Sequence, residues 1–191
     1  MASGRTKDGK RLSVRRARPS DLRGILRNMQ AVAEEGVYIW TERVSPDQRA
    51  SIRKNIGDPK ALVAVAEVDG EQVGYLVLRR YGEALKTRHL RNLGMAIVEG
   101  YRGIGVGAAL MDYAISWAER KGVEKIVLSV FSSNQRAKRL YEKKGFVVEG
   151  TLKGQHKIRG EYNDELVMAL WLGEGRGRAL ADERPQSAGI V

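Results

Sequence analysis

Three glycines in a short stretch of the chain are spaced as in a turn that binds phosphate. The stretch reads Arg102-Gly103-Ile104-Gly105-Val106-Gly107, with Ala108 next, and follows a strand-like pattern over residues 89–98. Glycine lets a backbone approach a ligand closely, and the N–H groups in the first turn of a helix have no partner within the helix. The helix dipole attracts negative charge, and Arg102 can pair with a phosphate. We therefore expect a phosphate site where this turn enters a helix over residues 105–121.

The spacing in this turn excludes two common phosphate motifs. No Gly-Lys-Ser/Thr triplet follows, as a P-loop requires, and Arg102-x-x-Gly105-x-Gly107 does not fit the dinucleotide fingerprint. A tight turn with only a structural role, joining a strand to a helix, is the alternative to a phosphate site.

A second segment carries two polar side chains at helical spacing. Asn134 and Tyr141 are seven residues apart, about two helical turns, in a helix expected over residues 134–144 and closed by Gly145. A phenol, with a pKa of about 10, can donate a proton to a departing group. Tyr141 is thus a candidate general acid, and the alternative is an amphipathic ring that caps the core.

Together the two segments resemble the GNAT superfamily of N-acetyltransferases. Its acetyl-CoA signature, Arg/Gln-x-x-Gly-x-Gly/Ala, is matched from Arg102 to Gly107, and its Asn-x-x-Ala-x-x-Leu-Tyr-x-x-x-Gly-Phe segment is matched from Asn134 to Phe146. The resemblance covers residues 12–172, roughly. It implies the GNAT fold, acetyl-CoA as the acyl donor, Tyr141 as the general acid and Asn134 as a contact to the pantetheine arm.

The resemblance also implies which groups would hold the donor. Cofactor contacts map onto the glycine turn through Ala108, although position 104, often basic in the family, is isoleucine here. In the family the strand before the turn splays from its neighbour, which leaves backbone groups of Ile97 and Val98 for the pantetheine amides and the thioester oxygen. Because the chain has no cysteine, an acetyl-cysteine intermediate is excluded and direct attack in a ternary complex is expected.

The general base is less closely specified. Glu35, at the end of a helix expected over residues 21–35, is our candidate, and Glu34 and Glu99 are the others. An amine can also lose its proton to water or to a carboxylate through water, so many residues could serve. The alternative for each glutamate is a solvated surface acid.

Three residues are candidates for the acceptor pocket. Trp40 follows an apolar run after the first helix and can form a pocket wall. Tyr162 and Asp164 resemble a Gly-x-Tyr-x-Asp segment in amino-acid and ribosomal-protein acetyltransferases, and would line the same pocket. Asp164 can instead fix a turn by binding backbone amides.

The composition of the 191-residue chain, 42% hydrophobic and 30% charged, is that of one soluble globular domain. No apolar run approaches the roughly 20 residues that cross a bilayer, and the polar N-terminus lacks a secretory signal, so a cytoplasmic protein is expected. His89 and His156 have no partner at metal-ligand spacing, so no metal is expected.

Positive charge is concentrated at the N-terminus. The net charge is +11, and residues 1–18 hold seven lysines and arginines against one aspartate. We expect residues 1–10 to be a basic disordered tail, 11–172 the acetyltransferase domain and 173–191 a flexible C-terminal tail. A basic arm can attract nucleic acid, but a solubilising tail is the interpretation we favour, and no nucleic-acid partner is expected.

Hydrophobic periodicity predicts the elements that position these residues. Strands are expected over residues 11–16, 61–68, 72–80, 89–98, 125–130, 146–151 and 166–171, and helices over 21–35, 46–56, 105–121 and 134–144. The expected fold class is α/β (α+β), the GNAT fold, with a central mixed, mostly antiparallel, six- to seven-stranded sheet flanked by about four helices.

Two functions remain open on the sequence. The first is an N-acetyltransferase that acts on the primary amine of an amino acid, a small molecule or a protein N-terminus, in a family where homodimers are common. The second is a non-catalytic CoA-binding regulatory module with a basic nucleic-acid-binding arm. The presence of Tyr141 favours the first.

Overall fold

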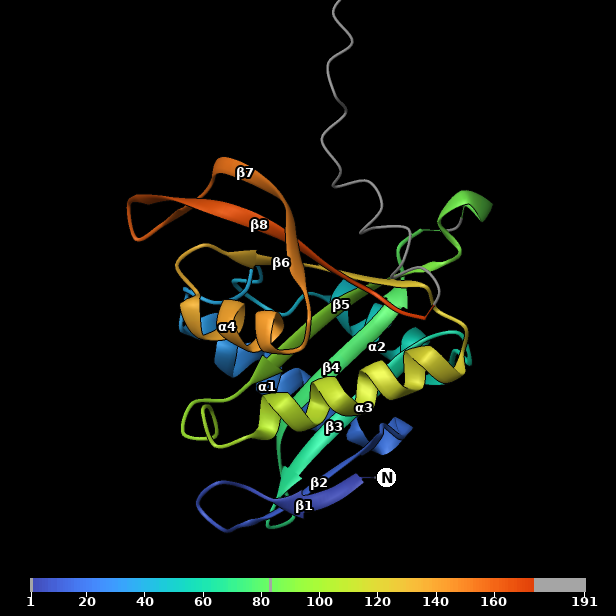
Figure 1. Cartoon of the computed structure of the whole chain (residues 1–191). Helices are drawn as coiled ribbons and strands as arrows, with labels where there is room; N and C mark the ends of the chain where they lie inside the picture. The colour runs from blue at the N-terminus through green and yellow to red at the C-terminus, as the bar shows by residue number, and fades with distance from the viewer. Residues whose placement is uncertain (1, 83, 174–191) are drawn as a thin grey trace, which may run out of the picture.

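A single mixed β-sheet with helices on both faces organises the chain (Figure 1). The computed structural model describes residues 2–82 and 84–173. Within those residues the sheet has eight strands, so the fold class is confirmed with slightly more strands than expected. The strands are β1 (Ala2–Arg5), β2 (Arg11–Arg16), β3 (Leu62–Val68), β4 (Glu71–Arg80), β5 (Leu90–Ile97), β6 (Lys125–Phe131), β7 (Val147–Ile158) and β8 (Glu161–Trp171).

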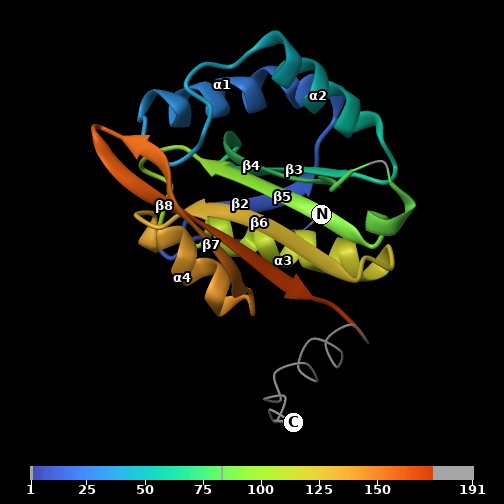
Figure 2. The ribbon, with the colours of Figure 1, turned by 90° about the horizontal axis from the view of Figure 1, so that it is seen from above.

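Four α-helices cover the sheet in the described ranges, two on each face (Figure 2). They are α1 (Leu22–Glu34), α2 (Pro46–Gly57), α3 (Val106–Arg120) and α4 (Gln135–Lys143), with short 3-10 helices η1 (Pro19–Asp21) and η2 (Leu85–Thr87). Ser45 begins α2 through a capping box with Gln48, as the sequence predicts for a serine before Pro46. Helices α1 and α2 share one face, and α3 and α4 the other.

The strand order, β1-β2-β3-β4-β5-β6-β8-β7, contains one parallel pair. All neighbours pair antiparallel except β5 and β6, which α3 connects across one face of the sheet. The parallel register runs only from Leu90 to Asn92 on β5, opposite Lys125 to Val127 on β6. Beyond Asn92 the two strands separate, so the middle of the sheet is open at one end.

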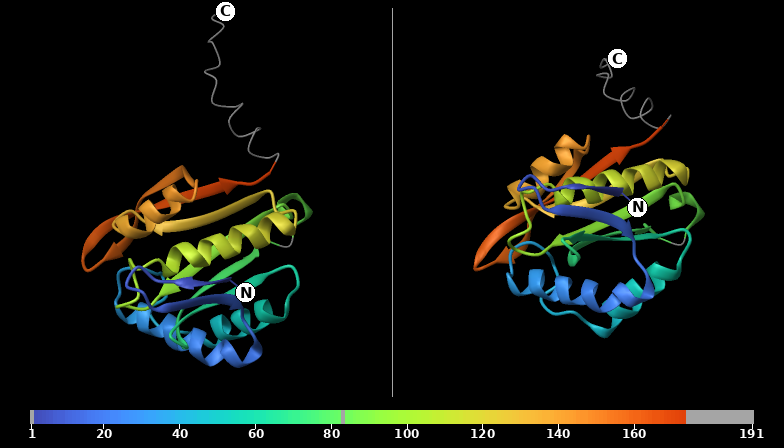
Figure 3. Two further views of the ribbon diagram at one scale, coloured as in Figure 1. Left: turned by 60° about the horizontal axis from the view of Figure 1, so that its bottom comes forward. Right: turned by 90° about the horizontal axis from the view of Figure 1, so that it is seen from below.

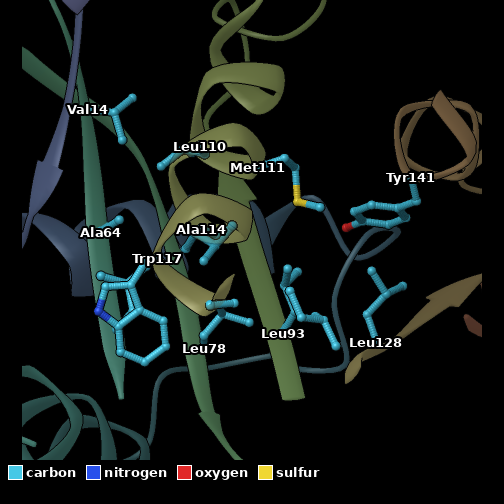
Figure 4. Packing of buried hydrophobic residues seen from close by; sticks show 14 of the residues in the cluster. Val14, Ala64, Leu78, Leu93, Leu110, Met111, Ala114, Trp117, Leu128 and Tyr141 are labelled. Carbon is cyan, nitrogen blue, oxygen red and sulfur yellow. The ribbon is translucent and has the colours of Figure 1, made fainter. Parts of the chain in front are cut away.

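Two apolar cores lie on opposite faces of the central strands. On β3, Leu62, Ala64 and Ala66 face α3, whereas Val63 and Val65 face α1 and α2, and all five are fully buried. Alternation of side chains across a strand explains why a strand covered on both faces reads as one continuous apolar run. Figure 4 shows side chains of α3 packed over the strands: Leu110, Met111, Ala114 and Trp117 near Ala64, Leu78 and Leu93.

The N-terminal residues form an edge strand, which corrects the expectation of a disordered tail over residues 1–10. β1 pairs antiparallel with β2, from Ala2 opposite Val14 to Arg5 opposite Arg11. All four β1 residues are exposed, so the strand is held by backbone pairing and not by burial, and hydropathy carries no signal of it. The connecting turn lies beside the segment between β5 and α3 (Figure 3).

The last hairpin is longer than the sequence predicts. β7 continues to Ile158 and β8 begins at Glu161, where we expected strands ending at residue 151 and starting at residue 166. The strands turn at Arg159 and Gly160, which both have positive φ, at 51° and 89°. Irregular register between Leu152 and His156 interrupts the alternation that would have indicated a strand.

The predicted C-terminal tail over residues 173–191 is the part of the domain prediction that concerns residues the structure largely does not describe. The expected C-terminal tail, apart from residue 173, lies beyond the described residues. In the ranges 2–82 and 84–173, the helices are all too short or too polar to cross a membrane.

Candidate active site

The separation of β5 from β6 forms part of a cavity of about 430 Å³. Its walls come from β5, the start of α3, the end of β6 and α4, and the segment after α1 closes one side. Of the residues expected to bind the cofactor, those that line it are Ile97, Arg102, Gly103, Gly105, Gly107, Ala108, Asn134 and Tyr141. Val106 is fully buried, and Ile104 packs against the α3 core, so both serve the turn through their backbone.

The glycine turn has the conformation that its sequence requires. Gly103 and Gly105 have φ of 82° and 107°, in the left-handed region that favours glycine. Gly105 is the N-cap of α3, and Ala109 N–H donates to its carbonyl to close the first helical turn. The N–H groups of Val106, Gly107 and Ala108 therefore lack intrahelical acceptors, and they form the positive end of α3. An anion in the cavity would meet these donors.

Gly107 allows α3 to pack closely against two other elements. A Cβ at this position would lie 2.9 Å from Leu140 Cδ2 on α4 and 3.2 Å from Ile97 Cδ1 on β5. Only the absence of a side chain permits this approach, so the third glycine of the turn sets the distance between α3 and α4.

Arg102 does not project freely toward a phosphate, which corrects part of the sequence interpretation. Its guanidinium makes a bidentate ion pair with the Glu35 carboxylate, with Nη1 2.7 Å from Oε2, and its Nε donates to the Ile97 carbonyl at 2.7 Å. The Tyr38 ring lies 4.6 Å from the guanidinium carbon. Hydrogen bonds to Glu35 raise the pKa of Arg102, which therefore stays charged.

The same ion pair engages Glu35, the candidate general base, which does not line the cavity. Glu35 is the C-cap residue of α1, and both of its carboxylate oxygens accept from Arg102. Its negative charge is matched by the Arg102 cation, and the pair holds the end of α1 beside the glycine turn.

The open edge of β5 offers fewer backbone groups than expected. Val98 N–H donates to the Val73 carbonyl on β4 at 3.0 Å, so it is not free for a ligand. Successive strand residues direct their backbone groups to opposite edges, which places those of Met95 and Ile97 toward the gap beside β6. Since Arg102 occupies the Ile97 carbonyl, the groups left are Ile97 N–H and both groups of Met95.

Asn134 and Tyr141 both line the cavity, as their spacing on one helix predicts. Asn134 caps α4 by accepting from Ala137 N–H at 3.1 Å, and within the described residues its Nδ2 has no partner. Tyr141 is only 6% exposed, and its side chain extends from α4 with the hydroxyl directed toward α3 (Figure 4). Burial raises the pKa of Tyr141 to about 12, so the phenol keeps its proton at neutral pH.

Trp40 forms part of the cavity wall. Its Nε1 donates to His156 Nε2 at 3.0 Å, and its ring meets Phe131 edge-on with centroids 6.0 Å apart. Glu165 Oε2 lies 2.9 Å from the same His156 nitrogen. These contacts tie the segment after α1 to the β7–β8 hairpin.

Tyr162 and Asp164 lie within β8, not before it, and neither lines the cavity. Tyr162 is 76% exposed, and its ring lies 5.4 Å from Lys157 Nζ. The Asp164 carboxylate accepts from Gly154 N–H at 2.9 Å and Lys153 Nζ at 2.8 Å. Of the two roles left open by the sequence, the structure favours the structural one, since Asp164 bonds the irregular part of the hairpin.

Cations that the sequence interpretation passed over also line the cavity. Arg136, Arg139 and Lys143 reach it from α4, and Lys7 reaches it from the turn after β1. The α4 residues recur at intervals of three and four, which places them on one face of the helix, and this spacing can be read from the sequence. No aspartate or glutamate in the described part of the chain lines the cavity. The site thus suits a ligand with several negative charges.

Comparison with known proteins agrees with this geometry. The model of the acetyltransferase (GNAT) family matches residues 26–146. This chain therefore belongs to the GNAT acetyltransferase family.

Two relatives and one solved structure illustrate the range of similarity. An uncharacterised N-acetyltransferase of Mycobacterium bovis is 34% identical over 102 residues, a match that spans 53% of this chain and only 63% of the relative. The L-amino acid N-acetyltransferase AaaT of Escherichia coli strain K12 is 30% identical over 143 residues, 74% of this chain and 81% of AaaT. The structure of yncA from Salmonella typhimurium with its cofactor acetyl-CoA has a TM-score of 0.78 at 24% identity, covering 85% of this chain and 95% of that one. The last likeness concerns the fold.

Proposed function

We propose that this chain transfers the acetyl group of acetyl-CoA to a primary amine, by direct attack of the amine in a ternary complex. The observation that carries the proposal is one cavity that joins the open N-terminus of α3 to the buried phenol of Tyr141. Acetyl-CoA supplies the activated thioester. It is also the cofactor named for the yncA structure, which shares the fold.

The donor fits the residues at the glycine end of the cavity. The first-turn N–H groups of α3 provide donors for a diphosphate, and Arg136, Arg139 and Lys143 add positive charge from α4. The free groups of Met95 and the Asn134 Nδ2 can bind the amides of a pantetheine arm. The cavity therefore offers both the charge and the hydrogen-bonding groups that CoA requires.

Tyr141 acts on the sulfur of the departing thiolate. Its pKa of about 12 keeps the hydroxyl protonated at neutral pH. Because that pKa exceeds the value of about 8.5 for a thiol, the phenol acts first by hydrogen bonding to the charge that develops on sulfur. As the C–N bond forms and the C–S bond breaks, transfer of the phenol proton to sulfur completes the departure and makes Tyr141 the general acid. The proton that the attacking nitrogen loses when it becomes an amide restores the phenol through water.

The acceptor must reach the thioester as a neutral amine. No carboxylate of the described residues lines the cavity, and Glu35 is paired with Arg102, so the amine loses its proton to water. This favours an acceptor of low basicity, such as an α-amino group at about pKa 8, over an alkyl amine at about pKa 10. The name of AaaT supports an amino acid as acceptor, and a protein N-terminus is chemically equivalent.

Release of the CoA thiol from acetyl-CoA, with a panel of amines, tests the proposal. We expect L-amino acids or short peptides with free N-termini to stimulate release above the hydrolytic background, and spermidine to have little effect. If acetyl-CoA binds while no amine in the panel stimulates release, the enzymatic proposal is wrong. Mass measurement of the acetylated product identifies the amine that reacted.

A further inference from the structure

The turn between β1 and β2 is built rigidly, although its residues are mostly exposed. Thr6 is 5% exposed; its N–H donates to the Lys10 carbonyl, and its Oγ1 accepts from Lys10 N–H, each at 2.9 Å. Arg5 Nη1 donates to the Gly9 carbonyl at 2.7 Å. These bonds fix the course of the backbone through residues 5–10.

This turn is joined directly to the glycine turn. Lys7 N–H donates to the Ile104 carbonyl at 2.9 Å, a contact between residues 97 positions apart. Lys7 also lines the cavity, on which Gly103 and Gly105 border. The nearest acid in sequence, Asp8, pairs with Lys10 at 3.2 Å, so no carboxylate of the described chain neutralises Lys7.

The positive charge of Arg102 is paired with Glu35, so this turn needs another cation to bind a phosphate. In many phosphate sites the arginine beside the glycines would bind the anion, but here Glu35 holds its guanidinium and neutralises it. The α4 cations belong to the opposite wall. On the β1 side, Lys7 is the cation among the described residues that both lines the cavity and is bonded to the glycine turn.

We propose that Lys7 binds the diphosphate of CoA, and that the β1–β2 hairpin is thereby part of the cofactor site. The inference rests on the proposed function, since it assumes that CoA occupies the cavity. The backbone bond to Ile104 holds the lysine at the turn, and the flexible side chain supplies one ammonium group to the phosphate oxygens. The N-terminal strand then contributes to donor affinity without contacting the acceptor.

Calorimetric titration of the full chain with CoA and with 3′-dephospho-CoA tests this assignment. We expect Lys7→Ala to weaken the binding of both ligands by about two- to fivefold, within the range for one exposed charge pair. The weakening should diminish at high salt, because exposed charges are screened. An unchanged affinity would overturn the inference, and so would a loss seen with CoA but not with dephospho-CoA, because the lysine would then bind the 3′-phosphate.

Lys10→Ala is the matched control. Lys10 belongs to the same turn, but its ammonium pairs with Asp8 and lies 5.7 Å from the centre of the Tyr101 ring, outside the cavity. We expect its CoA affinity to equal that of the unmodified chain. Thermal unfolding of both variants checks that the hairpin is intact. If the unmodified chain itself does not bind CoA, the proposed function fails, which differs from a failure confined to Lys7.

Discussion

Burial gives Tyr141 its chemical properties. The phenol sits in the wall of the cavity, next to the Phe146 ring at 5.8 Å between centroids, and desolvation is the cause of its high pKa. The unionised form is therefore present throughout the physiological pH range. The ring of Tyr162, by contrast, is mostly exposed to solvent.

Tyr141→Phe should lower turnover by about tenfold to a thousandfold, because the hydroxyl that stabilises the departing thiolate is lost. The ring and its packing remain, so affinity for acetyl-CoA should change little. Steady-state kinetics with the best amine of the panel, together with binding measurements, separates the two effects. Tyr162→Phe removes an exposed hydroxyl outside the cavity and should leave both unchanged; unchanged turnover in Tyr141→Phe would rule out the general-acid role.

Arg102 and Glu35 show how two residues can be recognised from the sequence while the interaction between them is not. The signature identifies Arg102, but its ion pair with Glu35 joins residues 67 positions apart and depends on the packing of α1 against the sheet. Both residues were singled out, and for roles that their pairing changes. Their charges are used to hold the segment after α1 against the glycine turn.

Among the elements, α3 and α4 meet at Gly107, which lines the cavity. Gly107 on α3 meets Leu140 on α4 without an intervening side chain. Tyr141 lies on α4, so the separation of the two helices affects the distance from the turn to the phenol.

Gly107→Val should push α4 away from α3, because even its Cβ would lie 2.9 Å from Leu140 Cδ2. We expect destabilisation by about 1–3 kcal/mol, as for other overpacked sites, and at least tenfold weaker CoA binding. Urea unfolding and calorimetric titration measure the two quantities.

Gly57→Val is the control for this change. Gly57 is also a helix residue, the last one of α2, but a Cβ there would meet nothing within 4 Å. Its CoA affinity should remain that of the unmodified chain. Normal binding in Gly107→Val would mean that α4 can shift without affecting the site.

At the scale of the whole molecule, one sheet is shared by two cores. Leu110 on α3 and Ile25 on α1 are both fully buried, on opposite faces of β3 and β4. Because each face depends on the same central strands, neither core can form a stable unit without the other. The chain should therefore unfold in a single cooperative transition.

Leu110→Ala and Ile25→Ala should each destabilise the fold by about 2–5 kcal/mol, since each leaves a cavity in a closely packed core. Both should shift the same urea transition, followed by tryptophan fluorescence and by far-ultraviolet circular dichroism. Separate transitions for the two probes, or a variant that affects only one of them, would show that the faces unfold independently.

Prediction from the sequence succeeded where structure depends on neighbouring residues. Helix periodicity located α1 and α3 to within a residue or two at each end, and the Asp-Gly pair at 69–70 indicated the β3–β4 hairpin. The two motifs identified the family as well, because the glycine turn and the face of α4 are each contained in a short stretch of chain.

Prediction failed where distant segments meet. Strand β1 is exposed and is held by backbone bonds that any sequence can make, so hydropathy could not distinguish it from a tail. The sequence leaves two roles open for Asp164, in a pocket or in a turn, because its bonds to Gly154 and Lys153 exist only in the folded hairpin.

The sequence by itself thus determined the family, the class of fold and the residues of the glycine turn and α4, because local conformation follows from local spacing and backbone preference. Only the tertiary structure decided how charge is distributed around the turn. It neutralised Arg102 with Glu35 and brought Lys7 to Ile104 from the other end of the chain. These pairings depend on how the strands and helices pack, and residues far apart in sequence carry no local sign of their contact.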